Sequence, residues 1–309
     1  MIEDEEMEQD DEFSPDELII RKKRPPELRT GVNAPAVVGI AADALGSLRQ
    51  KNPLVECIAG HVGSACAANS LFAVGASPMV VEDMGEATEL AHVADALLVN
   101  MGTVTKPQTD AMRAAVSHAN NSARPWVLVP SGVGSLPLRT FTTKELMRRF
   151  PAVIRGNGSE VTFLAGAPAG GRGSESLVPA KDAVPVAQRL ACVTRAVVVV
   201  AGDADFVAAE GTPAVCVRRG AWPRFAGAGC IHGALCAAFL GTLGTKARWE
   251  SALAATIVMA AAGDKALKAS NGPGTFLPAF VDALASLSPA ELKSLAKVEV
   301  LDPPPEIRS

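Results

Sequence analysis

Short, uninterrupted apolar runs alternate with helix-forming stretches along the first two thirds of the chain. Strands that are buried on both faces of a sheet have continuous apolar runs of this kind, whereas half-exposed strands alternate. The alternation of such runs with helices therefore predicts an α/β fold, with a doubly wound, mostly parallel sheet flanked by helices. The expected strands are 55–58, 78–81, 95–102, 126–129, 152–156 and 195–202.

The pattern changes after Gly202. Residues 205–220 are typical of a hairpin with a turn at Glu210–Thr212. Beyond the hairpin the sequence predicts helices only, and no second linker interrupts the chain. We therefore expect one domain, residues 34–309. Its last helices are expected at 229–245, 247–269 and 276–287.

The N-terminal segment differs from this domain in charge. Residues 1–33 contain 11 of the 33 acidic side chains and only 5 of the 29 basic ones. The stretch MIEDEEMEQDDEF has too little apolar surface to offset the entropy of ordering it. We therefore predict an acidic, disordered tail over residues 1–33. The basic run RKKRPP (21–26) is interpreted as a solvated linker, with nuclear import or anion binding as the alternative.

Composition excludes several classes of function. The formal net charge is −4, which gives no indication of nucleic-acid binding. No uncharged apolar run is long enough for a membrane span, and the N-terminus is acidic where a secretion signal needs basic residues. The six cysteines form no CxxC pair, which argues against a zinc site and indicates reduced thiols in a cytoplasmic protein.

Two glycine-rich loops could bind phosphate. In AGAGC (226–230), free N–H groups at the start of the next helix would converge on an anion, although a packing turn explains the glycines equally well. Cys230 is the first side chain after this turn, and a helix N-terminus is expected to lower a thiol pKa. A third loop, SNGPGTF (270–276), is better explained as a bend between helices than as a nucleotide contact.

The second of these loops, IRGNGSE (154–160), combines three useful side chains. Arg155 offers a charge-assisted fork to phosphate, and Asn157 and Glu160 offer oxygens to Mg²⁺ and its waters. The alternative is a turn followed by a helix cap. Together the loops indicate phosphoryl transfer, in which positioning and charge neutralisation provide most of the catalysis.

A set of motifs makes the expectation more specific. LFAVGASPM (71–79), NMGT (100–103), IRGNGSEVTFLAG (154–166) and FAGAGC (225–230) occur in an order that resembles the hydroxyethylthiazole kinase family, over about residues 50–290. The resemblance implies a ribokinase-like fold and homotrimers with active sites between subunits. It also implies transfer of the γ-phosphate of ATP, with Mg²⁺, to the hydroxyethyl group of 4-methyl-5-(2-hydroxyethyl)thiazole in thiamine biosynthesis or salvage.

The resemblance also assigns roles to individual residues. Gly227, Ala228, Gly229 and Cys230 would form the catalytic loop, with Cys230 where most ribokinase-like enzymes have an Asp base. The other assignments are Arg155, Asn157, Ala201 and Gly202 for ATP, Val80, Gly227, Asn69 and His61 for the thiazole, and Glu160 for magnesium.

Four positions depart from the family pattern by losing a polar group. Val129 replaces a strand-end Asp, Ala201 and Ala226 replace threonines, and Gly60 falls in IAG where the family has I-T-N. Asp203 or Asp205 could substitute for the missing carboxylate. These losses leave two alternatives open: a catalytically weakened or inactive ligand-binding homologue, or a kinase of another small alcohol.

Overall fold

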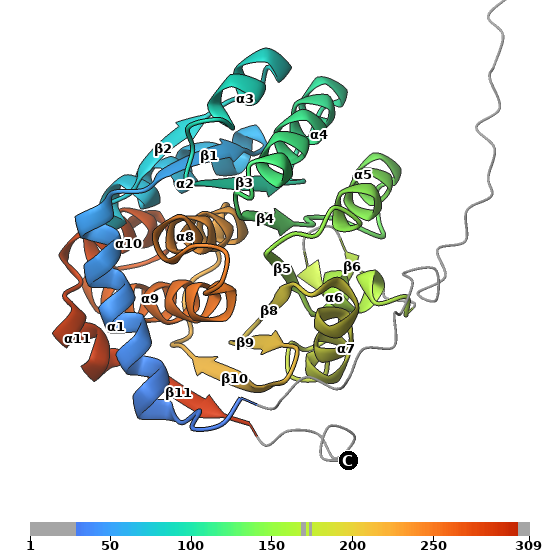
Figure 1. Ribbon diagram of the computed structural model, residues 1–309. Helices are drawn as coiled ribbons and strands as arrows, with labels where there is room; N and C mark the ends of the chain where they lie inside the picture. The colour runs from blue at the N-terminus through green and yellow to red at the C-terminus, as the bar shows by residue number, and fades with distance from the viewer. Residues whose placement is uncertain (1–28, 168–170, 173–174, 302–309) are drawn as a thin grey trace, which may run out of the picture.

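A mixed sheet runs through the computed structural model, which describes residues 29–167, 171–172 and 175–301 (Figure 1). Among these residues the sheet has nine strands in the order β11-β10-β9-β8-β5-β4-β3-β1-β2. Its strands are β1 (Leu54–Ile58), β2 (Ser77–Val80), β3 (Ala96–Asn100), β4 (Trp126–Val129), β5 (Val153–Asn157), β8 (Val197–Ala201), β9 (Ala204–Ala209), β10 (Thr212–Arg218) and β11 (Lys297–Val300). A separate pair, β6 (Gly171–Arg172) and β7 (Glu175–Ser176), lies outside it.

The strands from β2 to β8 are parallel, and β8, β9, β10 and β11 are joined by antiparallel pairings. The predicted mostly parallel, doubly wound sheet is therefore confirmed. The predicted hairpin is also present as β9 and β10, which are joined through Glu210 and Gly211. Because parallel strands point the same way, the loops after β1, β3, β4, β5 and β8 all lie at one edge of the sheet.

Helices cover both faces of the sheet (Figure 1). One apolar cluster joins the sheet to six helices, and a second cluster joins its other face to five. The first group contains α1 (Ala34–Lys51), α2 (His61–Val74), α8 (Ala228–Leu243), α9 (Arg248–Ala269), α10 (Pro273–Ser286) and α11 (Pro289–Leu295). The second contains α3 (Met84–Leu90), α4 (Lys106–Asn121), α5 (Pro137–Met147), α6 (Gly158–Leu164) and α7 (Val184–Thr194).

Helix α8 is the central helix of the first face. Every residue from Cys230 to Gly241 is buried, because α8 lies between the sheet and α9 and is apolar all around. A Cβ atom added at Gly233 would lie 2.5 Å from Cγ2 of Val129 and 3.0 Å from Cδ1 of Leu98. The small residue therefore lets α8 approach the strands closely, and this contact fixes where the N-terminus of α8 meets the sheet edge.

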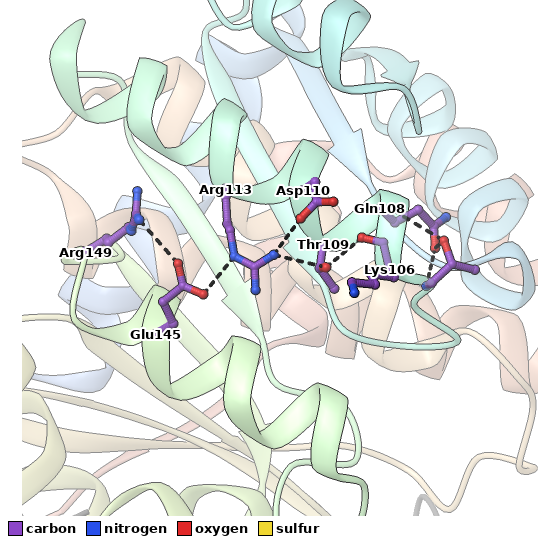
Figure 2. Close-up of polar contacts among 8 residues, drawn as sticks. Lys106, Gln108, Thr109, Asp110, Arg113, Glu145 and Arg149 are labelled. Carbon is purple, nitrogen blue, oxygen red and sulfur yellow. Dashed lines mark hydrogen bonds and ion pairs between the residues drawn. The ribbon is translucent and has the colours of Figure 1, made fainter. Parts of the chain in front are cut away.

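Polar side chains connect two helices on the opposite face (Figure 2). Arg113 of α4 donates from Nε to Glu145 Oε2 of α5 at 2.8 Å and from Nη1 to Asp110 at 2.8 Å. Arg149 also donates to Glu145, at 3.3 Å. Partly exposed ion pairs contribute at most about 1 kcal/mol each, so this network sets the register of α4 on α5 more than it stabilises the fold.

The C-terminal region differs from the prediction. The expectation that only helices follow the hairpin is wrong, because Lys297–Val300 form strand β11 and pair antiparallel with β10. Burial along β11 alternates between exposed and intermediate residues, as expected for an edge strand. The short apolar runs that mark the central strands are therefore missing here.

Most of the predicted acidic tail lies outside the described residues. Of residues 1–33, only Arg29–Asn33 are described, and they contain neither helix nor strand. The backbone N–H of Arg29 donates to the Gly211 carbonyl at 2.9 Å. Asn33 is the N-cap of α1, and its side chain accepts from the Ala36 N–H at 2.9 Å. The domain boundary near residue 34 remains a prediction.

Glu56 is a buried carboxyl group in the middle of β1. Its side chain is fully buried, and neither carboxyl oxygen has a hydrogen-bond partner in the described part of the chain. In register it lies between Met79 of β2 and Leu97 of β3. Burial raises the pKa of Glu56 from its ordinary 4.5 to about 8, because the charged form loses its water without gaining a partner.

We predict that Glu56→Gln removes a pH dependence of stability. The folded-state pKa is raised, so the contribution of Glu56 is complete below about 4.5, falls as pH rises and is lost above about 8. Urea unfolding from pH 5 to 9 should show the wild type losing stability by up to about 1.4 kcal/mol per pH unit relative to the variant. The exposed Glu89→Gln variant is the control, and parallel curves for wild type and Glu56→Gln would contradict the prediction.

Candidate active site

The predicted catalytic loop forms the N-terminus of α8 at the carboxyl edge of the sheet. Gly227 is the N-cap and has a φ of 94°, a left-handed conformation that favours glycine. No side chain caps this end of the helix. The N–H groups of Ala228, Gly229 and Cys230 have no carbonyl partner within α8, because Ile231 is the first to donate, to Gly227 O at 2.9 Å. Such a helix end attracts an anion through its N–H groups and its dipole.

Arg155 of β5 lies directly beneath this helix end. A Cβ atom added at Gly229 would be 2.7 Å from Nη1 of Arg155, so only a glycine leaves room for the guanidinium. The Nε atom of Arg155 is buried and has no partner among the described residues. No ion pair with Arg155 occurs in the described ranges either. A cation and an uncapped helix N-terminus therefore face the same place without a bound acid between them.

Glu160 and Asn157 form a capping box at the start of α6. Asn157 Oδ1 accepts from the Glu160 N–H at 2.9 Å, and Glu160 Oε2 accepts from the Asn157 N–H at 2.8 Å. Glu160 Oε1 also accepts from the Gly132 N–H at 3.0 Å. Burial raises the pKa of Glu160, against the effects of these N–H groups and of Arg155 and Arg139. The structural alternative, a helix cap, is therefore present, and it fixes the orientation of the carboxylate.

Cys230 is 4% exposed and lies against α2, where a Cβ atom added at Gly63 would be 2.8 Å from its sulfur. Burial raises the pKa of Cys230 to about 11, and the hydrogen bond from Asn100 and the charge of Arg155 only partly offset this effect. The expectation of a lowered thiol pKa at the helix N-terminus is therefore wrong. Cys230 is a neutral thiol at pH 7 and is not available there as a proton acceptor.

Asn100 is a site residue that sequence reasoning missed. It ends β3, is 4% exposed, and connects Cys230 to two loops: its Oδ1 accepts from the Gly102 N–H at 2.8 Å and from Ser131 Oγ at 3.3 Å. In register it lies beside Val129 of β4. Its position in the NMGT motif, near the end of a predicted strand, was the available signal.

The four departures from the family pattern have structural counterparts in this chain. A Cβ atom added at Gly60 would lie 1.6 Å from the Gly102 carbonyl oxygen and 1.9 Å from Thr103 Oγ1, so the loop after β3 fills the space of a side chain. Val129 is fully buried and is covered by Gly233 of α8. At the third position, the carbonyl oxygen of Ala226 accepts a weak hydrogen bond from the Cys66 thiol, with 3.8 Å between oxygen and sulfur.

The fourth departure, Ala201, ends β8, and Gly202 follows it in a tightly held turn. The Gly202 N–H donates to Asp205 Oδ1 at 3.1 Å, and the Gly202 carbonyl accepts from Arg219. Asp205 is 4% exposed, and burial raises its pKa although Arg155 and Arg219 act in the opposite direction. Of the two aspartates, Asp205 and not the exposed Asp203 is the one affected by the charge of Arg155.

His232 lies below the loop in the core and is fully buried. Its Nε2 is 3.0 Å from Thr256 Oγ1, which itself donates to the Ala252 carbonyl at 2.7 Å, so Nε2 carries the proton. The Nδ1 atom is 3.9 Å from Asp205 Oδ2. Burial, and then the charges of Arg155 and Arg219, lower the pKa of His232, so its ring is neutral. The Nδ1 atom has no hydrogen-bond partner among the described residues, so His232 packs in the core beside Asp205 without bonding to it.

The predicted thiazole-binding residues lie toward the outer edge of the sheet. His61 begins α2 and is exposed, with Nδ1 3.3 Å from Glu82 Oε1. Val80 ends edge strand β2 and is 38% exposed. Asn69 is also exposed and lies in α2, two turns beyond His61. No hydrogen bond or ion pair joins these three residues to Arg155 or Cys230 in the part of the chain that the structure describes.

Comparison with known proteins identifies the arrangement. The model of the hydroxyethylthiazole kinase family matches residues 45–290. The chain belongs to this family. A protein named hydroxyethylthiazole kinase from Escherichia coli is 42% identical over 250 residues, which cover 80% of this chain and 94% of that protein. One with the same name from Klebsiella pneumoniae is 45% identical over 239 residues, covering 77% and 91%.

Solved structures agree with the family assignment. A hydroxyethylthiazole kinase structure from Pyrococcus horikoshii OT3 superposes with a TM-score of 0.75 at 27% identity, covering 85% of this chain and 99% of that one. A Staphylococcus aureus pyridoxal kinase in complex with pyridoxal gives 0.57 at 17% identity, covering 80% and 98%. The second match is informative about the fold alone, and it supports the expected ribokinase-like architecture.

We predict that Gly229→Ala impairs anion binding while leaving the fold intact. The new Cβ must displace the Arg155 guanidinium, which is the movable end of a long side chain, whereas alanine favours the helix. ATP affinity by calorimetry should fall about tenfold, the size of one charge-assisted hydrogen bond, with an unchanged melting temperature. Gly46→Ala in α1, where a Cβ meets open space, is the matched control. Unchanged ATP affinity in Gly229→Ala would refute the placement of Arg155.

Proposed function

We propose that this enzyme transfers the γ-phosphate of ATP to the hydroxyethyl group of 4-methyl-5-(2-hydroxyethyl)thiazole, in thiamine biosynthesis or salvage. The observation that carries the proposal is the uncapped N-terminus of α8 facing an Arg155 that has no acid partner within 4 Å among the described residues. This pairing favours a group with several negative oxygens, which is the character of a transferring phosphoryl group. The name of the family indicates the acceptor, the hydroxyethyl group of the thiazole.

The donor set fits a magnesium ion that is held mainly by the nucleotide. Glu160 supplies one oriented carboxylate, and position 129, where the resemblance to the family implies a second acid, is a buried valine. No group of three or more His, Cys, Asp or Glu side chains that could hold a metal occurs within the described ranges. Mg²⁺ is commonly bound by one or two carboxylates, substrate phosphates and waters, so Glu160 would hold it together with ATP. Bound there, it would neutralise phosphate charge.

The residues of the chain act on the phosphoryl group by position and charge. Arg155 would bind the phosphate oxygens, and the N–H groups of 228–230 would receive the charge that develops during transfer. Cys230, as a neutral thiol held by Asn100, would border the acceptor hydroxyl without removing its proton. A loose transition state requires little base assistance, so a site without a strong base is compatible with transfer.

The acceptor and the assembly are proposed from the edge of the sheet. We place the thiazole against the backbone of Gly227, with His61, Asn69 and Val80 at the outer wall. Several large apolar side chains of this edge are exposed: Val62, Phe72, Met79 and Met84. An exposed apolar patch on an edge strand and its helix is typical of a subunit interface. We therefore propose a homotrimer with the active sites at this edge.

No described helix is long and apolar enough to cross a membrane. We place the enzyme in the cytoplasm and expect no nucleic-acid partner, as the near-neutral domain and the unpaired spacing of its six cysteines indicate.

We predict unequal effects for two substitutions in the site. Arg155→Ala should lower kcat about 10²- to 10³-fold, because it removes charge stabilisation of the transition state. Cys230→Ala should stay within about tenfold of the wild type, because a neutral thiol contributes contacts and not proton transfer. Magnesium-dependent ADP release with the thiazole alcohol measures both. Similar rates for Arg155→Ala and wild type would disprove the proposed mechanism.

The lost polar groups favour a second candidate, a homologue with weakened or no turnover. Under this alternative ATP or the thiazole binds in calorimetry without ADP release. Val129→Asp should then raise turnover, because it restores an acid beside Asn100, although a carboxylate buried against Gly233 will cost stability. If ADP release by the wild type is fast and Val129→Asp only slows it, the weakened homologue is ruled out. A panel of thiazole, pyrimidine and sugar alcohols tests the third possibility, a different acceptor.

A further inference from the structure

A cavity lies at the opposite edge of the sheet from the active site. It has a volume of about 400 Å³ and is formed where β8 begins, where β9 turns into β10 and where α9 starts. Its charged lining consists of Arg29, Arg195, Lys246, Arg248, Glu210 and Glu250. The proposed kinase reaction uses none of these residues. These side chains are therefore available for a different interaction.

The lining has an excess of positive charge. Four cationic side chains face two carboxylates, and one carboxylate, Glu250, is already paired with Arg29 at 2.7 Å. Arg195 and Lys246 are exposed, and within the described ranges their side chains make no ion pair or hydrogen bond. Arg248 is more enclosed, and its burial lowers its pKa. The cavity consequently offers uncompensated cations to an anion.

The N-terminus of α9 adds to this charge. The N-cap is Ala247, which provides no capping side chain, and the first intrahelical donor is Ser251, to Ala247 O at 2.9 Å. The N–H groups of residues 248–250 are thus left at the cavity wall. The indole N–H of Trp249, a residue that is 6% exposed, also has no partner among the described residues. The N-terminus of this 22-residue helix favours the same kind of ligand as the cations.

The chain enters the fold at this cavity. Arg29 is attached to its wall by three contacts: the backbone bond to Gly211, the ion pair with Glu250, and a guanidinium 4.6 Å from the centre of the Trp249 ring. The residues that precede Arg29 are therefore tethered at the rim. Between positions 3 and 17 they include ten acidic side chains and no basic one.

We propose that this cavity binds carboxylates of the chain's own N-terminal segment, residues 3–17. The charges are complementary, and Glu17 precedes Arg29 by 12 residues, which span up to about 40 Å when extended. A short tether raises the effective concentration of the segment into the millimolar range, so weak ion pairs are sufficient. The basic residues 21–24 compete for the same acids, and the experiment has to separate the two partners.

The first measurement is the rate at which Lys246 is acetylated by an N-hydroxysuccinimide ester, followed by mass spectrometry. It compares the full chain with a full-length variant in which the ten acids of 3–17 are replaced by Asn and Gln. At low salt we expect Lys246 to react about threefold faster in the variant, the effect of one or two exposed ion pairs. In 1 M NaCl, where the Debye length is about 3 Å, the two rates should converge. Lys106, at the start of α4, is the internal control.

The second measurement identifies the partner by zero-length carbodiimide cross-linking of the full chain. We expect links from Lys246 to acids of 3–17, in material that runs as a single chain on a denaturing gel. Equal acetylation rates in the two chains overturn the proposal. If added inorganic phosphate then slows the reaction of both chains, the cavity binds a free anion and not the N-terminal segment, and the proposal is overturned as well. Links from 3–17 exclusively to Lys22 and Lys23 overturn it as well. Neither readout depends on kinase activity.

Discussion

The active site depends on the electrostatic repulsion between the Arg155 guanidinium and the N-terminus of α8, which the fold leaves uncompensated. The guanidinium of Arg155 lies against the positive end of α8, with Gly229 as the only separation, and the nearby acids are occupied elsewhere. Glu160 accepts two backbone N–H groups, and Asp205 accepts the Gly202 N–H. Burial holds α8 in place against this repulsion, because twelve consecutive residues pack between the sheet and α9. Apolar packing thus maintains a positive pocket that an anion stabilises.

The sequence could predict the parts of the fold that depend on local pattern. Continuous apolar runs identified the central strands, since they are buried on both faces wherever the sheet places them. Strand β11 was missed because Lys297–Val300 alternate in burial and exist as a strand only through pairing with β10, which is distant in the sequence. The helix and turn chemistry around Asn157 was visible, and sequence reasoning favoured a phosphate and magnesium site there over the helix cap, which the structure shows as a capping box.

The residues of the candidate site divide in the same way, into those that a short motif identifies and those that only the fold brings together. Arg155 and the AGAGC turn carry their chemistry in a short stretch, so motif reasoning was able to select them. The NMGT motif and the pair Asp203 and Asp205 were visible in the sequence. The contacts that Asn100, Asp205 and Arg219 make between separate strands and loops follow from no local pattern. The thiol pKa of Cys230 was assigned in the wrong direction for a related reason. Its raised value comes from enclosure by α2 and the sheet, and this burial outweighs the helix end.

The positions of the first and last helices have a consequence for synthesis on the ribosome. Strands β1 to β5 and helices α2 to α7 are complete before residue 195, but α1 packs against α8, α9 and α11, which are made later. One face of the parallel sheet therefore remains uncovered until translation has passed residue 269. Until then, α1 also lacks the helices against which it packs. During that interval the nascent chain exposes the apolar surface that α8 and α9 cover in the finished fold. A late stop codon that removed α9 would leave that part of the apolar surface exposed in the truncated chain.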